Sequence, residues 1–442
     1  MHSFSRTTFL NLFVVCLAVG KATASSKICS WENNKDSSKG DCADGMESSK
    51  LKYAPPSIST SPIEVPAKIL MGPGPSTPHP RVLQAGAAPL LGHMHPEFFR
   101  IMDDTQAWLR YGFQTSNTAT LAVSGTGHAA MEMAVANTVE PGDQVIVGVN
   151  GIWGERMTDI AARFGAKVIP METKPGTVFS YEDVKAALEK NPGTKIVFVV
   201  HGESSTGTLQ PLAGLGKLCH EQGALLFVDT VCTLGGVPLN VDADELDIVY
   251  SGSQKCLGAP PGASPLTLSD KATAKLAARK TKVQSYYFDL NEVGPYWGVG
   301  GAARKYHHTG MVSNVYQLRE ALAMLAEEGL EAAWARHQQM ADRLYEGLKQ
   351  LGLELFVEDP AARLPTVTTI KVPKGVNWAD VPAFLMKKYK LEIAGGLGPT
   401  AGQVWRVGIM GFNAQPRNIE LLLVALKDAL THVGFLKDEK VV

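Results

Sequence analysis

The sequence predicts an α/β protein: a large domain with a mostly parallel β-sheet covered by helices, followed by a smaller C-terminal α+β domain. From about residue 66 to 255, apolar segments of 4–7 residues alternate with amphipathic segments. This alternation is typical of parallel strands that are buried on both faces. A long helical stretch from Val315 to about Leu351 then separates the alternating region from a second one, in which short strands and helices are mixed.

The expected elements follow one another regularly along the large domain. Strands are expected at 68–71, 120–123, 143–149, 166–171, 195–200, 224–229 and 247–250, and helices at 128–139, 153–164, 182–190 and 212–223. In the smaller domain, strands are expected at 353–357, 366–372, 391–396 and 403–410, with helices at 379–388 and 418–432. A length of 442 residues is too great for one ordinary core, which also favours two domains.

Four segments are expected along the chain: 1–45 as an N-terminal targeting or disordered extension, 46–67 as an arm, 68–328 as the large domain and 329–442 as the small domain. Residues 1–26 combine Arg6, an apolar run at 9–20 and the small residues Ala22-Thr23-Ala24, which is the pattern of a cleavable targeting sequence. The same segment is rich in Ser and Thr, so both a secretory and a mitochondrial destination stay open. Met46 offers an alternative start.

Composition excludes several classes of partner. Hydrophobic residues make up 45% and charged residues 19% of the chain, as in ordinary globular enzymes. A net charge of −1 argues against nucleic acid and anionic membranes as main partners. No apolar run after residue 20 approaches the length of a membrane span. The six cysteines have neither metal-ligand spacing nor the density of a disulfide scaffold, so no metal site is expected.

Polar residues gather where the predicted parallel strands end. They are Ser124 to His128, His201 to Ser204, Asp229 and Lys255. In open α/β sheets, ligands bind at the carboxyl ends of the strands. The sequence therefore predicts a ligand site at this edge of the sheet.

Lys255 follows the tight turn that ends a short strand, and it enters a stretch that is rich in Gly and Pro. Burial and nearby dipoles can lower a lysine pKa and make the amine a Schiff-base nucleophile. The alternative is a lysine whose stem packs and whose charged end reaches solvent. Asp229 closes the apolar strand "LLFVD", where it could pair with a pyridinium nitrogen or cap a following helix. Both interpretations of Asp229 stay open at this point.

Three further features fit the same site. "SGTGH" at 124–128 lies between a strand and a helix, where backbone amides and hydroxyls can hold a phosphate. Trp153 begins a helix just after a strand, so its ring could stack on a flat heterocycle or pack in the core. Arg406 is a lone cation in the apolar strand "QVWRVGIMG", suited to a substrate carboxylate or to an internal salt bridge.

Together these motifs resemble those of a known family. The chain from Met46 to about Leu436 is similar to class V, fold-type I pyridoxal phosphate (PLP)-dependent aminotransferases, in particular the alanine–glyoxylate and serine–pyruvate aminotransferases. The motifs that carry the resemblance are "MGPGPS" at 71–76, "SGTGH" at 124–128, "NGIWGER" at 150–156, "HGESSTG" at 201–207, "VDTVCTLGG" at 228–236, "YSGSQK" at 250–255, "YHHT" at 306–309, "LPTVTT" at 364–369 and "GGLGP" at 395–399.

The resemblance implies roles for individual residues. Lys255 would bind the cofactor covalently and carry a proton, and Asp229 would pair with the ring nitrogen. Trp153 would stack on the ring, Ser204 would lie beside it, and Arg406 would bind the substrate carboxylate. The remaining implied cofactor-binding residues hold the phosphate and are Thr126, Gly127, His128 and Gln254, with Tyr306 and Thr309 from the neighbouring subunit.

The implied enzyme is a homodimer with its active site at the subunit interface, and it acts on small amino and keto acids. The resemblance implies transfer of the amino group of L-alanine to glyoxylate, giving glycine and pyruvate, with serine–pyruvate activity beside it. A 3-hydroxykynurenine or serine-preferring transaminase of the same family is the alternative. The resemblance also implies a peroxisomal or mitochondrial location, although the chain ends in "DEKVV" rather than a Ser-Lys-Leu type signal.

Overall fold

The computed structural model describes residues 53–437. The chain divides into two units, residues 1–64 and 65–442. In the first unit, the described residues 53–64 form no helix or strand, and their side chains are exposed. The predicted targeting sequence, the alternative start at Met46 and the last five residues lie outside the described part of the chain. No helix between residues 53 and 437 is both long and apolar enough to span a membrane.

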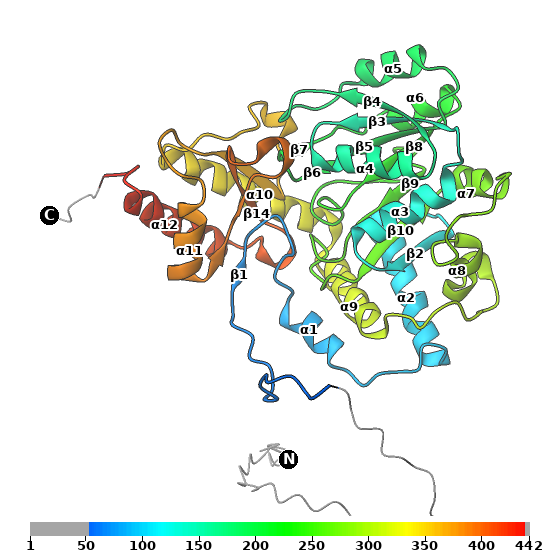
Figure 1. The fold of residues 1–442 in the computed structure, drawn as a ribbon, viewed down its shortest axis with the longest axis horizontal. Coiled ribbons are helices and arrows are strands. Elements are labelled where there is room, and N and C mark those ends of the chain that lie inside the picture. The colour runs from blue at the N-terminus through cyan, green and yellow to red at the C-terminus, as the bar shows by residue number, and fades with distance from the viewer. Residues whose placement is uncertain (1–52, 438–442) are drawn as a thin grey trace, which may run out of the picture. The chain divides into compact units, whose positions relative to one another are not determined.

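A seven-stranded sheet forms the centre of residues 65–328 (Figure 1). Its strands, in spatial order, are β2 (Ala119–Ser124), β10 (Ala263–Leu268), β9 (Ile248–Tyr250), β8 (Leu225–Asp229), β5 (Ile196–Val200), β3 (Gln144–Val149) and β4 (Lys167–Glu172). Only β10 runs antiparallel to its two neighbours, so the other six strands share one direction. Their carboxyl ends therefore meet at one edge of the sheet, as the sequence predicts.

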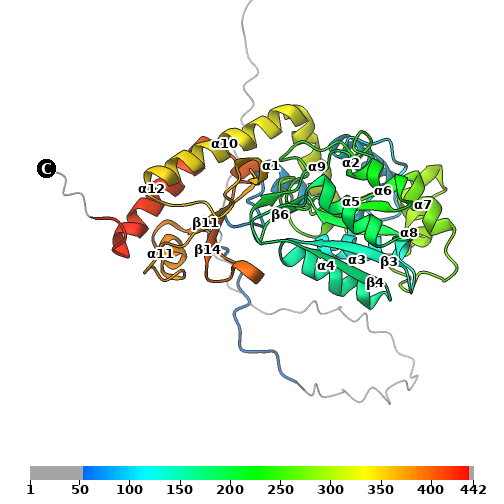
Figure 2. The ribbon, with the colours of Figure 1, turned by 90° about the horizontal axis from the view of Figure 1, so that it is seen from above.

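Helices cover both faces of this sheet, which confirms the predicted α/β class. Figure 2 shows α3 (Gly127–Thr138) and α4 (Ile152–Arg163) on one side, and α5 (Tyr181–Lys190) and α6 (Leu215–Glu221) on the other. The remaining helices of this region are α1 (Pro80–Gly86), α2 (Pro96–Phe113), α7 (Asp270–Ala277), α8 (Leu290–Trp297) and α9 (Val312–Glu328). Strands β5 and β8 are buried along their whole length, as expected for strands covered on both faces.

The sequence prediction missed strand β10. The segment 259–265 contains Pro260, Pro261 and Pro265, and prolines argue against a central strand because they lack a backbone donor. Here the carbonyl oxygen of Pro265 still accepts a hydrogen bond from the Ser251 N–H at 2.9 Å, and the ladder to β2 continues through the neighbouring residues. The acceptor side of a proline is enough to keep the strand in the sheet.

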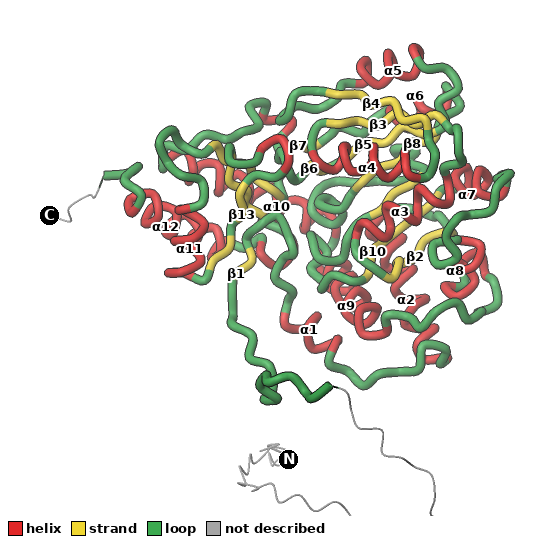
Figure 3. The backbone as a smooth tube through the Cα atoms, in the orientation of Figure 1, coloured by secondary structure: helices red, strands yellow, loops and turns green. Residues whose placement is uncertain are grey.

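The C-terminal region is built on a second, antiparallel sheet (Figure 3). Strand β14 (Val404–Gly408) lies between β11 (Val367–Lys371) and β13 (Ala394–Gly395). The helices are α10 (Leu330–Gln350), α11 (Asp380–Tyr389) and α12 (Pro416–His432), and β1 (Ile69–Leu70) pairs with β12 (Leu391–Glu392). The predicted helical stretch from 315 to 351 is therefore two helices, which Gly329 separates with a φ of 86°.

One predicted strand of this region is not formed. Residues 353–357 make only an isolated bridge between Leu355 and Ile370. Two flanking backbone hydrogen bonds hold the segment beside β11, and a turn of 3₁₀ helix at Pro360–Ala362 then ends the pairing. Each sheet has its own cluster of buried hydrophobic side chains. The domain boundary at residues 328 and 329 stays a prediction.

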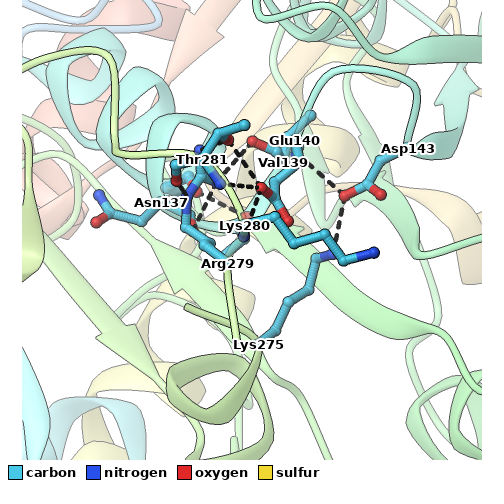
Figure 4. Close-up of polar contacts among 10 residues, drawn as sticks. Asn137, Val139, Glu140, Asp143, Lys275, Arg279, Lys280 and Thr281 are labelled. Carbon is cyan, nitrogen blue, oxygen red and sulfur yellow. Dashed lines mark hydrogen bonds and ion pairs between the residues drawn. The ribbon is translucent and has the colours of Figure 1, made fainter. Parts of the chain in front are cut away.

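Polar contacts fix the end of α3 that lies away from the strand ends (Figure 4). The carboxylate oxygen Oε1 of Glu140 accepts hydrogen bonds from the backbone of Lys280 and Thr281 at 2.9 and 2.8 Å, and from the Thr281 hydroxyl at 2.8 Å. Beside it, Arg279 donates to the carbonyl oxygen of Val139 at 2.7 Å. These contacts hold the connection between α3 and β3 against the segment that follows α7.

Candidate active site

A cavity of about 260 Å³ opens at the carboxyl ends of β2, β8 and β9. Eight of the residues predicted for the site line it: Thr126, Gly127, His128, Trp153, Ser204, Asp229, Gln254 and Lys255. Met131, Gly202, Val231, Cys232 and Tyr250 complete the lining. Segments that are up to 130 residues apart in the chain therefore meet in one pocket, because the parallel strands end at the same edge.

The first turn of α3 forms one end of the cavity. Thr126 is the N-cap of this helix, and its side chain makes no capping hydrogen bond. The first backbone N–H groups of a helix have no intrahelical partner, and the helix dipole adds partial positive charge there. Gln254 lies in the same lining, and its side-chain NH₂ group is a further donor for an anion. This end of the cavity suits a phosphate.

Trp153 forms one wall of the cavity and is held at two points. Its indole Nε1 donates to the Ser204 hydroxyl at 2.9 Å, and its backbone N–H donates to Glu203 at 3.1 Å. The ring also makes an edge contact with His128, at 5.6 Å between ring centroids. Burial, followed by the charge of Arg156, lowers the pKa of His128. A neutral His128 can accept from Arg156, whose Nη1 lies 3.2 Å from its Nε2.

Asp229 lies opposite, at the end of β8, and is only 3% exposed. It accepts from the Val231 N–H at 2.7 Å and from the Tyr250 hydroxyl. Burial raises the pKa of Asp229 to about 6, while these two donors and Lys255 favour the ionised form. No helix begins directly after Asp229, because the next described element is strand β9, so the alternative role as a helix cap does not apply. The carboxylate can pair with a cationic ring nitrogen instead.

Tyr250 was not predicted as a site residue. It faces Asp229 because the two are partners in the register of β8 and β9. Burial, and then the charge of Asp229, raises the pKa of its hydroxyl far above the usual value, so it stays a donor. From the sequence alone, a tyrosine in a buried strand is expected to be a core aromatic. Only the register between β8 and β9 shows that its hydroxyl points toward Asp229.

Lys255 reaches the same space from the turn after β9. Its side chain is half-buried, rather than fully enclosed as its sequence context suggests. The Nζ atom donates to the carbonyl oxygen of Pro73 in the loop after β1. Gly74 makes this approach possible, because a Cβ at that position would collide with the lysine side chain, and its φ of 115° also favours glycine.

Arg406 lies on the central strand β14 and is 7% exposed. Its Nε donates to the Gly395 carbonyl at 2.7 Å and its Nη1 to the Ser204 carbonyl at 3.3 Å. Among the described residues it forms no salt bridge, so the alternative of an internal ion pair is wrong. A guanidinium has five N–H donors, and three of them remain to grip a carboxylate. Ser204 places this group next to the cavity.

The two residues expected from the neighbouring subunit do not join this set. Tyr306 is 55% exposed, and its ring contacts His93 at 5.6 Å between centroids. Thr309 is exposed as well, and neither residue lines the cavity of its own chain. Between them, His308 contacts the Ser124 hydroxyl at 2.7 Å, at the start of the "SGTGH" segment.

The residues that line the cavity fit a molecule with four chemically different groups. The start of α3 offers donors for an anion, Trp153 offers a flat face, and Asp229 offers a carboxylate for a basic ring nitrogen. Lys255 adds an amine on the same cavity wall. Phosphate, flat heterocycle, basic nitrogen and reactive carbonyl are the groups of pyridoxal phosphate, so the residues present fit this cofactor.

Comparisons with known proteins agree with this geometry. Residues 84–416 match the family Aminotransferase class-V. Alanine–glyoxylate aminotransferase of Oryctolagus cuniculus is 48% identical over 387 residues, which covers 88% of this chain and 98% of that protein. The (S)-ureidoglycine–glyoxylate transaminase of Bacillus subtilis is 36% identical and covers 83% of this chain and 91% of that protein. The crystal structure of alanine–glyoxylate aminotransferase from Nostoc sp. superposes with a TM-score of 0.82 at 49% identity, over 84% of this chain and 98% of that one.

The fold and the cavity thus define a class V aminotransferase. The chain belongs to this family, as the resemblance of its motifs predicted. Membership implies pyridoxal phosphate as the cofactor and small amino and keto acids as substrates.

Proposed function

We propose that the protein binds pyridoxal phosphate in the cavity at the ends of β2, β8 and β9, and transfers the amino group of L-alanine to glyoxylate, giving pyruvate and glycine. The observation that carries this proposal is the convergence of Lys255, Asp229 and Trp153 with the first turn of α3 in one cavity. The choice of substrates rests on the relatives from Oryctolagus cuniculus and Nostoc sp., which are named alanine–glyoxylate aminotransferases.

The bound cofactor would supply an aldehyde that accepts the amino group and an electron sink for the pair left when the substrate Cα loses its proton. Asp229 would hold the ring nitrogen in its protonated form, and the Tyr250 hydroxyl keeps Asp229 in place. Trp153 and Ser204 would orient the ring, and the first turn of α3 with Gln254 would hold the phosphate.

The substrate is oriented by Arg406 and deprotonated by Lys255. The free donors of Arg406 grip the α-carboxylate, which alanine and glyoxylate share. This would fix Cα toward the wall that carries Lys255, whose amine would take the proton from Cα.

We also propose that the active enzyme is a homodimer in which Tyr306 and Thr309 complete the phosphate site of the neighbouring subunit. The exposure of both residues and their absence from the cavity of their own chain support this arrangement.

Substitution of Lys255 tests the proposed chemistry. Lys255→Ala should lower turnover of alanine with glyoxylate by roughly 10³-fold or more, because one amine serves as nucleophile and as proton carrier. Pyridoxal phosphate should still bind non-covalently, since the phosphate and ring contacts remain. Pyruvate formation and cofactor absorbance measure the two effects.

The exposed Lys282 provides the control, and Lys282→Ala should leave turnover unchanged. Turnover of Lys255→Ala within tenfold of the wild type would contradict the assignment. Wild-type protein that turns over other amino donors but not alanine would contradict the choice of substrate alone.

A further inference from the structure

The carboxylate of Glu203 lies behind the cavity wall and is fully buried. It does not line the cavity itself. Its Oε2 accepts from the Trp153 N–H at 3.1 Å, and its Oε1 accepts from the Ser205 N–H at 2.9 Å and the Ser205 hydroxyl at 2.6 Å. Three donors therefore converge on the two oxygens.

Helix α4 begins at this carboxylate. Its N-cap, Gly151, has no side chain to satisfy the first N–H groups of the helix. Ser205 and Glu203 do this from another part of the chain: the Ser205 hydroxyl accepts from the Ile152 N–H at 3.1 Å, and Glu203 accepts from Trp153. A Cβ at Gly151 would collide with Glu203, so the glycine lets the carboxylate approach.

The charge state of Glu203 follows from its partners. Burial raises its pKa to about 7, while the hydrogen bonds from Ser205 and Trp153 favour the ionised form. All three groups that contact the carboxylate are donors, and each oxygen meets an N–H, so a protonated carboxyl would turn its own O–H proton toward one of these N–H groups. An anion at a helix N-terminus is also favoured by the helix dipole.

The segment 203–205 thus holds Trp153 at both ends. Glu203 fixes its backbone and Ser204 fixes its indole nitrogen. The same segment meets the C-terminal region, because Arg406 donates to the Ser204 carbonyl and the Thr400 hydroxyl donates to the Ser205 carbonyl at 2.7 Å. Three successive residues, 203–205, therefore fix the positions of both Trp153 and Arg406.

We propose that Glu203 is a positioning residue for the cofactor-binding wall: its carboxylate anchors the start of α4 and so fixes the face that Trp153 presents to the cavity. The effect on the cofactor passes through Trp153, since Glu203 does not reach the cavity. The part of this proposal that concerns pyridoxal phosphate rests on the proposed function, whereas the anchoring of α4 does not.

The test replaces Glu203 by an amide of the same shape. In Glu203→Gln, one of the two oxygens becomes an NH₂ group, and in either orientation this group faces an N–H donor. Amide hydrogen exchange of residues 151–157 in the full-length protein should become at least about tenfold faster, as expected for loss of a hydrogen bond to a charged group. The dissociation constant of pyridoxal phosphate, measured by titration of the cofactor-free protein, should rise by about tenfold or more.

Glu140 provides a matched control away from the cavity. It lies just beyond the C-terminal end of α3, and this helix places it about 18 Å from the first turn, which lines the cavity. Like Glu203, it accepts two backbone N–H groups and one hydroxyl (Figure 4). All three donors of Glu140 meet its Oε1, so Glu140→Gln can keep its amide oxygen on them. It should leave both the exchange of 151–157 and the cofactor affinity within twofold of the wild type.

Ser205→Ala keeps the test decisive if Glu203→Gln does not fold. It removes the hydroxyl that links the Ile152 N–H to Glu203 and keeps the carboxylate, so exchange of 151–157 and the dissociation constant should both rise severalfold. The proposal is overturned if a folded Glu203→Gln, or failing that Ser205→Ala, leaves both quantities within twofold of the wild type. It is also overturned if Glu140→Gln raises the dissociation constant of pyridoxal phosphate as much as Glu203→Gln does.

The two proposals fail in different ways. Wild-type protein that does not bind pyridoxal phosphate would contradict the proposed function, while faster exchange of 151–157 in Glu203→Gln would still support the anchoring of α4. Normal cofactor binding with unchanged exchange would contradict the role of Glu203 alone.

Discussion

The cavity at the strand ends and the segment 306–309 carry residues of the same predicted site, yet they are built differently. In the cavity, eight predicted residues from the start of α3, the start of α4, the segment 203–205, the end of β8 and the turn after β9 line one pocket within one chain. In the segment 306–309, Tyr306 and Thr309 are exposed and do not line that cavity. The first region is assembled by the geometry of a single sheet, whereas the second would act only on the proposed neighbouring subunit.

This difference separates two kinds of functional residue. Asp229 is fixed by a strand, a register partner and a backbone N–H, so its environment is set before any ligand binds. Tyr306 has a ring contact to His93 and otherwise open surroundings. Substitutions in the cavity should therefore change chemistry strongly, and substitutions in the segment should change affinity and depend on the partner.

After Lys255→Ala, the largest effect among the cavity residues is expected for Asp229→Asn. An amide cannot keep a ring nitrogen protonated, so turnover should fall by about 10²- to 10³-fold, the loss typical of one preorganised electrostatic group. The cofactor should remain bound, which its absorbance will show. Normal turnover of this variant would mean that Asp229 only supports the turn at Val231.

The same residue predicts a stability change with pH in the cofactor-free protein. Burial raises the pKa of Asp229 to about 6 in the folded state, against about 3.8 when solvated. Because the folded protein holds this proton more tightly, protonation of Asp229 stabilises the fold fully at a pH below 3.8, the pKa of the solvated carboxyl. This stabilisation is lost as the pH rises through about 6, the pKa in the folded state. Relative to Asp229→Asn, the free energy of unfolding of the wild type should fall by roughly 2 kcal/mol between pH 4 and pH 7.5. Denaturant unfolding at both pH values measures this, and a pH-independent difference would contradict the raised pKa.

Arg406→Lys should have a smaller effect. Lysine offers a point charge without the planar fork, so the grip on a carboxylate loses on the order of 1.5–3 kcal/mol and kcat/KM falls roughly 10- to 150-fold. Stopped-flow absorbance should show the loss in both half-reactions, because alanine and glyoxylate share the α-carboxylate.

Arg363 is the matched control for this change. It also lies in the C-terminal region and donates to two backbone carbonyls, those of Val357 and Glu358. Arg363→Lys should leave kcat/KM within twofold of the wild type. A loss confined to one half-reaction of Arg406→Lys would mean that another residue holds the carboxylate.

Much of the cavity could be predicted from the sequence because its residues obey local rules. Asp229 ends one apolar strand, Lys255 follows the turn after another, and parallel strands end at one edge of the sheet. Tyr250 could not be predicted, since its role depends on the register between β8 and β9. Glu203 was visible only as part of "HGESSTG", because its partners at the start of α4 lie some 50 residues away. Strand β10 was hidden by its prolines, which the acceptor side of the ladder tolerates.

The smallest expected effect tests the other side of the comparison, the segment 306–309. Loss of one hydrogen bond to a phosphate in Tyr306→Ala should raise the dissociation constant of pyridoxal phosphate by about tenfold.

Mixed dimers decide which of the two active sites is affected. If Tyr306 serves its neighbour, a dimer of Lys255→Ala with Tyr306→Ala keeps one site with both groups and should show wild-type cofactor affinity in its active half. A dimer of wild type with the double variant Lys255→Ala, Tyr306→Ala should then have a weakened active site. If Tyr306 serves its own chain, the two mixtures exchange behaviour, because each active subunit would depend on its own tyrosine. Activity measured against cofactor concentration in both mixtures separates the two arrangements, and equal affinity in both would remove Tyr306 from the site.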